Sequence, residues 1–126
     1  MNIDKKYYQE INENLTNTIQ DTNISAPNKK VGKVRDAYFL NDKVVMISTD
    51  RQSAFDRVLA AIPYKGAVLN SVSAWWFKKT EHLFPNHLIS TPDPNVSIVE
   101  KCTVFPVEFV VRGYITGTTD TSLWTV

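Results

Sequence analysis

Apolar side chains recur every four residues at the start of the chain, a spacing that places them on one face of an α-helix. The polar segment that follows, residues 23–28, contains Pro27 and predicts a linker. We therefore expect residues 1–29 to form a peripheral helix and a linker into the main fold. The helix is predicted over residues 3–20, with an apolar stripe of Ile3, Tyr7, Ile11, Leu15 and Ile19.

After residue 30 the pattern changes to β-rich runs. Two such runs lie on either side of Asn41-Asp42, a pair typical of tight turns, and they predict a hairpin over residues 30–48. The polar segment 49–56 predicts a loop. Apolar residues then return at helical spacing, which predicts a helix over residues 67–79.

Short apolar runs punctuated by prolines make up the rest of the chain. They predict a short strand at 87–90, a loop at 92–94, and two strands at 97–104 and 107–114 that join near Pro106. Alternation along the last strand places its odd-numbered apolar residues toward the core. These residues are Val107, Phe109 and Val111.

The mixture of hairpins and helices, without regular β-α-β alternation, predicts an α+β fold with a largely antiparallel sheet and flanking helices. Hydrophobic residues make up 43% and charged residues 21% of the 126 positions, which is typical of a globular protein and argues against a disordered one. The net charge of +1 gives no long-range attraction for nucleic acid or an anionic membrane. We therefore expect neither as a partner.

Cysteine and histidine are too scarce for several kinds of site. The single cysteine, Cys102, cannot form an internal disulfide, and within a predicted strand we expect it to be inert core. With only His82 and His87 beside it, a structural metal site is not expected. The first residues lack the apolar run of a signal peptide, which favours a cytoplasmic protein.

The run Gly32-Lys33-Val34-Arg35-Asp36 is the first candidate for chemistry. A glycine lets backbone amides approach an anion closely. Lys33 and Arg35 alternate along a predicted strand and would point the same way, so at a hairpin they could hold a triphosphate. The spacing is not that of a P-loop. The alternative is a basic exposed strand edge that deters aggregation.

Two further groups of polar residues could form a site. Residues 49–56, TDRQSAFD, follow an apolar strand, and loops at strand ends often carry function. Asp50 and Arg51 could equally be a surface ion pair, and Ser53 could cap a turn. Arg112 could grip a carboxylate or phosphate with Gly117 and Thr118, or it could pair with Glu108.

The aromatic residues and one histidine are weaker candidates. Trp75, Trp76 and Phe77 could stack on a base, but at helical spacing core packing is favoured. His87 could be a catalytic base, although a turn histidine bonded to backbone is favoured.

Five runs occur together in one order and carry a resemblance to a known family. They are GKVRD (32–36), TDRQSAFD (49–56), IPYKGAVL (62–69), PNH (85–87) and EFVVRGYITGTTDTSLW (108–124). Over residues 30–126 the chain resembles the phosphoribosylaminoimidazole-succinocarboxamide synthase (SAICAR synthetase) family. The resemblance implies an ATP-binding lobe at residues 30–108 and the start of a second lobe at 109–126, which stops short of the family's length.

The resemblance also implies an activity. Members of this family join L-aspartate to carboxyaminoimidazole ribonucleotide, with hydrolysis of ATP to ADP and phosphate and a requirement for Mg²⁺. A non-catalytic nucleotide-binding fragment is the alternative. Because the Mg²⁺-directed residues are expected beyond Val126, we expect no metal ligand in this chain and little or no activity from it alone. The sequence does not predict the oligomeric state.

Residue roles follow from the resemblance position by position. Residues 32–35 resemble the loop over the ATP phosphates, with Gly32, Lys33, Val34 and Arg35 as contacts. Residues 102–107 resemble a hinge that adenine lies against, which adds Lys101 and Val104 to the ATP site. Substrate binding is expected at Ser53, Arg112, Gly117 and Thr118, and catalytic roles at Asp56 and Arg112.

Overall fold

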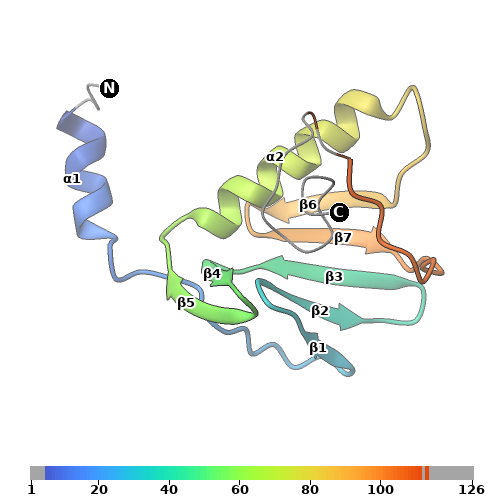
Figure 1. Ribbon diagram of the computed structural model, residues 1–126, viewed down its shortest axis with the longest axis horizontal. Coiled ribbons are helices and arrows are strands. Elements are labelled where there is room, and N and C mark those ends of the chain that lie inside the picture. The colour runs from blue at the N-terminus through green and yellow to red at the C-terminus, as the bar shows by residue number, and fades with distance from the viewer. Residues whose placement is uncertain (1–4, 112, 114–126) are drawn as a thin grey trace, which may run out of the picture.

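The computed structural model describes residues 5–111 and residue 113. In this part of the chain, a five-stranded antiparallel sheet carries a long helix across one face, with a two-stranded hairpin beside it (Figure 1). This confirms the predicted α+β class. The strand order in the sheet is β1 (Lys29–Val31), β2 (Arg35–Phe39), β3 (Lys43–Ser48), β7 (Val96–Glu100) and β6 (Leu88–Asp93).

The hairpin predicted over residues 30–48 is confirmed as strands β2 and β3. Arg35 pairs with Ser48 at one end of the ladder and Phe39 with Val44 at the other. Strand β1 adds a third antiparallel strand, which the sequence did not predict as a separate element. Residues 32–34 connect β1 to β2, and we call them the β1–β2 loop.

Residues 51–54 form a strand within the segment 49–56 that was predicted to be a loop. Strands β4 (Arg51–Ala54) and β5 (Arg57–Ala61) pair in a second hairpin, whose two-residue turn is Phe55-Asp56. The prediction was wrong because the most buried side chain of β4 is Arg51. A strand with a polar buried residue lacks the apolar alternation by which strands are predicted.

The predicted helix at 67–79 is confirmed as α2 (Lys65–Thr80), which lies across the sheet (Figure 1). Polar contacts tie α2 to the sheet, because buried Asn70 accepts a bond from the Ser97 hydroxyl (2.7 Å) and donates to the Pro94 carbonyl (3.0 Å). Helix packing is close at Gly66, where a Cβ atom would lie 2.2 Å from the Ser48 carbonyl oxygen. Only glycine fits there without movement of the backbone.

Strand β6 extends into the predicted loop at 92–94 and ends at Asp93. It lies at the edge of the sheet, where Pro92 is tolerated because an edge strand has no neighbour on one side. The turn to β7 follows at Pro94 and Asn95, and the Asn95 side chain donates to the Ser48 carbonyl at 2.7 Å.

Helix α1 (Lys5–Glu13) is shorter than the predicted 3–20 and stands apart from the sheet (Figure 1). Its end coincides with Asn14, whose side chain donates to the Glu10 carbonyl at 2.9 Å. Asparagine and threonine in residues 14–18 compete for backbone bonds in this way and disfavour helix. Ile19 lies beyond the helix and makes two hydrogen bonds with Asp50. Its amide donates to the Asp50 carboxylate at 2.8 Å, and its carbonyl accepts from the Asp50 amide at 2.8 Å.

Several residues predicted as core are exposed. Val107, Phe109 and Val111 belong to no strand, and their exposed fractions are 61%, 81% and 97%. Alternation alone does not make a strand, and residues 101–111 pair with no strand in the described part of the chain. Cys102 is also exposed, since it lies beyond the end of β7.

The expectation that the aromatic residues of α2 pack in the core was wrong for its tryptophans. Trp75 and Trp76 are 56% and 55% exposed and pack edge-to-face on each other. The buried hydrophobic residues of the described chain are instead Tyr38, Val44, Ile47 and Val99, all in the sheet. Within residues 5–111 and 113, neither helix is long and apolar enough to cross a membrane.

Candidate functional site

The β1–β2 loop forms a tight turn at Gly32. The Gly32 amide donates to the Arg35 carbonyl at 2.7 Å, and a Cβ atom on residue 32 would lie 2.7 Å from that same oxygen. Any other residue would force the turn open. The run GKVRD therefore needs its glycine for a close approach between two segments of backbone.

Arg51, the first residue of β4, holds this loop from the inside. Its Nη2 donates to the Gly32 carbonyl (3.0 Å), and its Nε donates to the Lys33 carbonyl (3.2 Å). Its Nη1 donates to the carbonyl of Gln20 in the linker (2.8 Å). Arg51 is 8% exposed, so these bonds are protected from solvent and join the loop, the linker and the second hairpin.

Asp36 supplies the countercharge for Arg51. Its fully buried carboxylate accepts bonds from Arg51 Nη2 at 2.7 Å and the Thr22 hydroxyl at 2.7 Å, and it lies 3.3 Å from Lys29 Nζ. Burial raises the pKa of the Asp36 carboxyl. The hydrogen bonds from Arg51, Thr22 and Lys29 outweigh burial and hold this pKa below its ordinary value. The cluster therefore carries a stable internal charge pair beneath the loop.

The alternative that Asp50 and Arg51 form a surface ion pair was wrong. Both side chains are buried, and each has other partners. The Asp50 carboxylate accepts from the Ile19 amide and from the Gly66 amide, each at 2.8 Å. Since the N-cap residue Tyr64 makes no side-chain bond, Asp50 takes its place at the N-terminus of α2.

Lys33 lies in the turn of the β1–β2 loop rather than on a strand, so the predicted alternation with Arg35 along one strand was wrong. Its Nζ contacts the carboxylate of Asp56, a residue in the turn of the second hairpin, at 2.5 Å. Hydrogen bonding between the two raises the pKa of Lys33 and lowers the pKa of Asp56. Both side chains are mostly exposed, at 67% and 85%, so the pair can open at little cost.

Ser53 and Asp56 lie on the second hairpin, in β4 and in its turn. Ser53 is half-buried and pairs with Val58 in the ladder. The alternative that Ser53 caps a turn is therefore wrong. Phe55 and Asp56 both have positive φ angles, 50° and 61°. This is the signature of a type I′ turn, and it directs Asp56 toward Lys33.

The predicted hinge follows β7 and lines an apolar groove. The Lys101 amide donates to the Asp42 carbonyl at 3.0 Å, which fixes the start of the segment. Beyond it, a groove of about 710 Å³ opens between residues 102–109, the end of α2 and the turn at 85–87. Exposed Val104 lines this groove, and so does His87, whose ring packs edge-on against Phe77 (5.1 Å between centroids).

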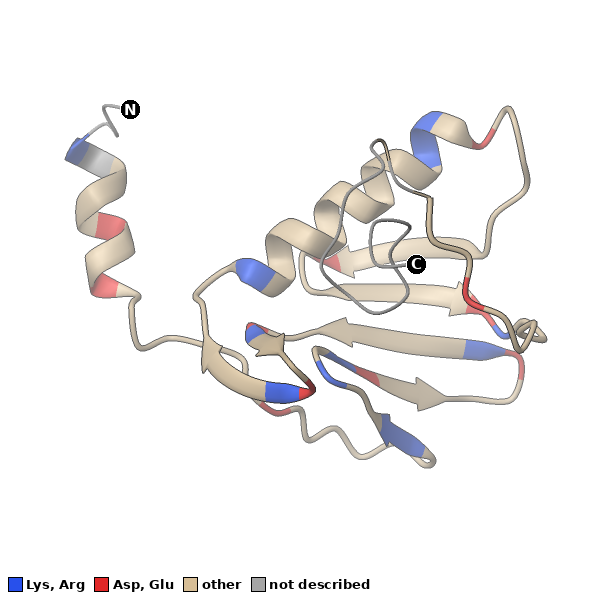
Figure 2. Ribbon diagram, viewed as in Figure 1, with Lys and Arg blue, Asp and Glu red and all other residues tan. Residues whose placement is uncertain are grey.

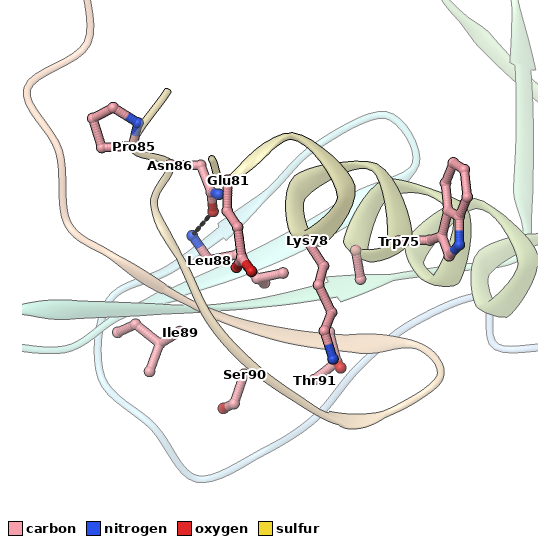
Figure 3. Close-up of a pocket in the computed structure, with 10 residues that line it drawn as sticks. Trp75, Lys78, Glu81, Pro85, Asn86, Leu88, Ile89, Ser90 and Thr91 are labelled. Carbon is pink, nitrogen blue, oxygen red and sulfur yellow. Dashed lines mark hydrogen bonds between the residues drawn. The ribbon is translucent and has the colours of Figure 1, made fainter. Parts of the chain in front are cut away.

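A second groove, of about 610 Å³, lies on the other side of the 85–86 turn, between α2 and β6 (Figure 3). Trp75 and Lys78 of the helix and Glu81 just after it line this groove together with Ser90 and Thr91 of the edge strand, and Lys78 points toward Thr91 (Figure 3). Its lining contains none of the residues expected to bind ATP or substrate from the family resemblance, and of the weaker candidates it contains Trp75. The groove at the hinge is therefore the better match to the predicted site.

Three of the predicted site residues, Arg112, Gly117 and Thr118, lie outside the described residues. Within the described ones, no group of three or more histidine, cysteine or acidic side chains could hold a metal ion. Acidic and basic residues are spread over several strands, helices and connecting segments (Figure 2).

Sequence reasoning did not identify Arg51, Thr49 and Asp36 as the supports of the loop. Thr49 contacts it as well, because its backbone amide (3.0 Å) and its hydroxyl (2.8 Å) both donate to the Val34 carbonyl. One signal was present: Asp36 and Arg51 each belong to a polar run beside an apolar strand. Asp36 and Arg51, however, lie 15 residues apart in the chain.

The fold and the β1–β2 loop define the class of protein. It is an α+β lobe in which a glycine turn carries an exposed lysine and is hydrogen-bonded to buried Arg51. Comparisons with known proteins identify the family within this class. The family model for SAICAR synthetase matches residues 28–125, so the chain belongs to the SAICAR synthetase family.

Relatives and solved structures agree with this assignment. The chain is 62% identical over 107 residues to phosphoribosylaminoimidazole-succinocarboxamide synthase of Legionella pneumophila (strain Lens), covering 85% of this chain and 34% of that protein. The chloroplastic synthase of Arabidopsis thaliana is 58% identical over 121 residues, which is 92% of this chain and 29% of that protein. The chain thus spans about a third of the length of the curated relatives it matches.

Two solved structures are similar in fold. SAICAR synthase from Saccharomyces cerevisiae, complexed with SAICAR, aligns with a TM-score of 0.71 at 31% identity, covering 79% of this chain and 42% of that one. A type-2 SAICAR synthetase in complex with ADP aligns with a TM-score of 0.57 at 30% identity, covering 63% of this chain and 35% of that one.

Proposed function

We propose that the protein acts in purine biosynthesis as the nucleotide-binding part of an ATP-dependent ligase that joins L-aspartate to carboxyaminoimidazole ribonucleotide. The observation that carries the proposal is Lys33, held on a glycine turn whose carbonyls are tied to Arg51, in a chain of the SAICAR synthetase family. One relative of similar fold was solved with ADP and another with SAICAR, which supports nucleotide substrates for this chain.

The reaction explains why an anion site is needed. A carboxylate is a poor electrophile, because its charge repels an amine and it lacks a leaving group. Transfer of the terminal phosphoryl group of ATP makes an acyl phosphate and ADP. The aspartate amine then attacks the acyl carbon, phosphate leaves, and the amine loses a proton. Most of the rate gain in such a reaction comes from positioning and charge neutralisation.

In this proposal the β1–β2 loop covers the phosphates of ATP. Lys33 leaves Asp56 and neutralises phosphate charge, while Gly32 and Val34 bring backbone close and Arg35 adds a second cation at the start of β2. The exposure of the Lys33–Asp56 pair favours this exchange, since an exposed pair contributes little to stability.

The adenine base lies in the hinge groove. Val104 supplies an apolar contact there, and Lys101, whose amide donates to the Asp42 carbonyl, precedes the lining segment in the chain. Apolar linings with a few polar groups are typical of sites that bind flat ligands.

The remaining assignments rest on the family resemblance. Arg112, with Gly117 and Thr118, binds the imidazole nucleotide, and Arg112 also acts in catalysis. Ser53 and Asp56 contribute from the second hairpin, with Asp56 released for its catalytic role when Lys33 moves to the phosphates. For Mg²⁺, the described residues offer no cluster of ligands. A cytoplasmic location stays part of the proposal, although one relative is named chloroplastic.

A second function is a nucleotide-binding lobe without turnover of its own. The chain spans about a third of the length of its curated relatives, so the activity of this span has to be tested by itself. A coupled ADP-release assay separates the two functions, with ATP, Mg²⁺, L-aspartate and carboxyaminoimidazole ribonucleotide present and each omitted in turn. ADP release that needs all the substrates supports the ligase. ATP binding without release supports the lobe alone, and the absence of both contradicts the proposal.

A further inference from the structure

Three consecutive carbonyl oxygens in the β1–β2 loop accept hydrogen bonds from two residues at the start of the second hairpin. Arg51 donates to the carbonyls of Gly32 and Lys33, at 3.0 Å and 3.2 Å. Thr49 donates twice to the carbonyl of Val34, at 3.0 Å from its amide and 2.8 Å from its hydroxyl. Since Arg51 and Thr49 are both buried, all three carbonyls point into the protein.

A planar trans peptide then dictates where the amides point. In such a unit the carbonyl and the N–H of the next residue lie on opposite sides of the chain. With the Gly32 and Lys33 carbonyls directed at Arg51, the N–H groups of Lys33 and Val34 point away from it, out of the protein. Neither amide donates a hydrogen bond to any residue in the ranges 5–111 and 113.

We propose that Arg51 is a positioning residue for phosphate binding: it holds the loop carbonyls inward so that the Lys33 and Val34 amides face the anion. Successive outward N–H groups form an anion-binding concavity, and the Lys33 ammonium adds charge to it. Arg51 itself does not touch the phosphate, because it is buried on the opposite side of the loop. The inference rests on the proposed function of the loop.

The geometry requires a guanidinium rather than any cation. Arg51 reaches four acceptors at once, the carbonyls of Gln20, Gly32 and Lys33 and the Asp36 carboxylate. A planar fork with five donors can span these directions, whereas a lysine ammonium is a compact charge on a flexible stem. Lysine at position 51 should therefore keep the charge pair with Asp36 and lose the orientation of the loop.

The test is a titration of the ¹⁵N-labelled chain followed by NMR, with tripolyphosphate as one probe and adenosine as the other. In the unmodified chain, tripolyphosphate should shift the Lys33 and Val34 amide resonances.

Arg51→Met should weaken tripolyphosphate binding about tenfold or more, and Arg51→Lys should weaken it about threefold. Neither variant should change binding of adenosine, which a general loss of structure would change. Arg57→Met, an exposed arginine at the start of β5, is the matched control and should bind both probes normally.

The outcomes separate the two proposals. If the unmodified chain shows no tripolyphosphate shifts, the proposed phosphate site fails. If it binds and folded Arg51→Met binds equally well, with the same amide shifts, the positioning role is wrong. Should Arg51→Met not fold, Thr49→Val decides instead, because it removes only the hydroxyl donor to Val34. That variant should weaken tripolyphosphate binding about threefold with adenosine unchanged, and unchanged tripolyphosphate affinity contradicts the inference.

Discussion

At the scale of single residues, hydrogen-bonded polar side chains connect the elements around the β1–β2 loop. Asp36, Arg51 and Asp50 are all buried, and each contacts a segment distant in sequence. No buried side-chain polar atom in the described part of the chain lacks a partner. Satisfied buried networks of this kind specify one arrangement, because every alternative leaves a charge or donor unpaired.

The Asp36 cluster should make stability depend on acid pH. The pKa of Asp36 is lowered by folding, so its contribution is fully present above the unfolded value of about 3.9 and is lost as pH falls through the lower folded value. Urea unfolding between about pH 5 and pH 2 should show a smaller pH dependence for Asp36→Asn than for the unmodified chain. Asp42→Asn, in an exposed turn, serves as control. Equal slopes for Asp36→Asn and the unmodified chain would contradict the assignment.

Removal of Arg51 should destabilise the fold more than removal of an exposed arginine. Arg51→Met leaves Asp36 buried with fewer partners and should lower the free energy of unfolding by about 3–5 kcal/mol. Arg57→Met should change it by less than about 0.5 kcal/mol. Chemical denaturation of both variants gives the comparison, and similar small losses would mean that Asp36 does not depend on Arg51.

At the scale of elements, the sequence predicted those with regular apolar patterns. The β2–β3 hairpin and α2 were both found at close to their predicted bounds. Strand β4 was missed because it buries Arg51, and the strand predicted at 107–114 failed in its described part because apolar alternation does not ensure a partner. The sequence marked GKVRD as a candidate anion site, which stays a prediction, and it did not reveal the residues that support this loop. Spacing cannot reveal that Arg51 bonds to Gln20, 31 positions away.

Helix α2 should depend on a glycine at position 66. Gly66→Ala places a Cβ atom 2.2 Å from the Ser48 carbonyl oxygen and should cost about 2–3 kcal/mol in stability, since the overlap is with backbone. Gly113→Ala is the control, because a Cβ atom there has no neighbour within 4 Å. Thermal unfolding of the two variants checks this, and equal midpoints would mean that α2 does not pack as described.

The turn of the second hairpin should be improved by a residue that favours positive φ. Phe55 is 97% exposed with φ of 50°, so Phe55→Gly relieves backbone strain without loss of packing. We expect stability to rise by about 1 kcal/mol in urea unfolding. Phe105→Gly should give no such gain, since Phe105 is exposed without a positive φ. A loss of stability for Phe55→Gly would contradict the turn assignment.

At the scale of the whole molecule, exposed apolar side chains extend over much of α2. Val68, Val72, Trp75 and Trp76 are all more than half exposed. A helix that is apolar on several sides is usually buried on several sides. The exposed face of α2 is therefore predicted to bind apolar probes.

That face can be tested with an apolar fluorescent dye. A Val72→Ser, Trp76→Gln double variant should bind markedly less dye than the unmodified chain and keep its stability within about 1 kcal/mol, because both side chains are exposed. Substitution of an exposed residue outside this face of α2, such as Lys43→Ser, should leave dye binding unchanged. A double variant that unfolds would show that these residues are core.

The central claim is that the β1–β2 loop binds the phosphates of ATP, and calorimetric titration of the chain with ATP tests it most directly. We predict that the unmodified chain and the Lys43→Ala control bind ATP alike, whereas Lys33→Ala binds about tenfold more weakly or not at all, because a charge-assisted contact to phosphate is lost. Equal ATP affinity for Lys33→Ala and the unmodified chain would contradict the claim.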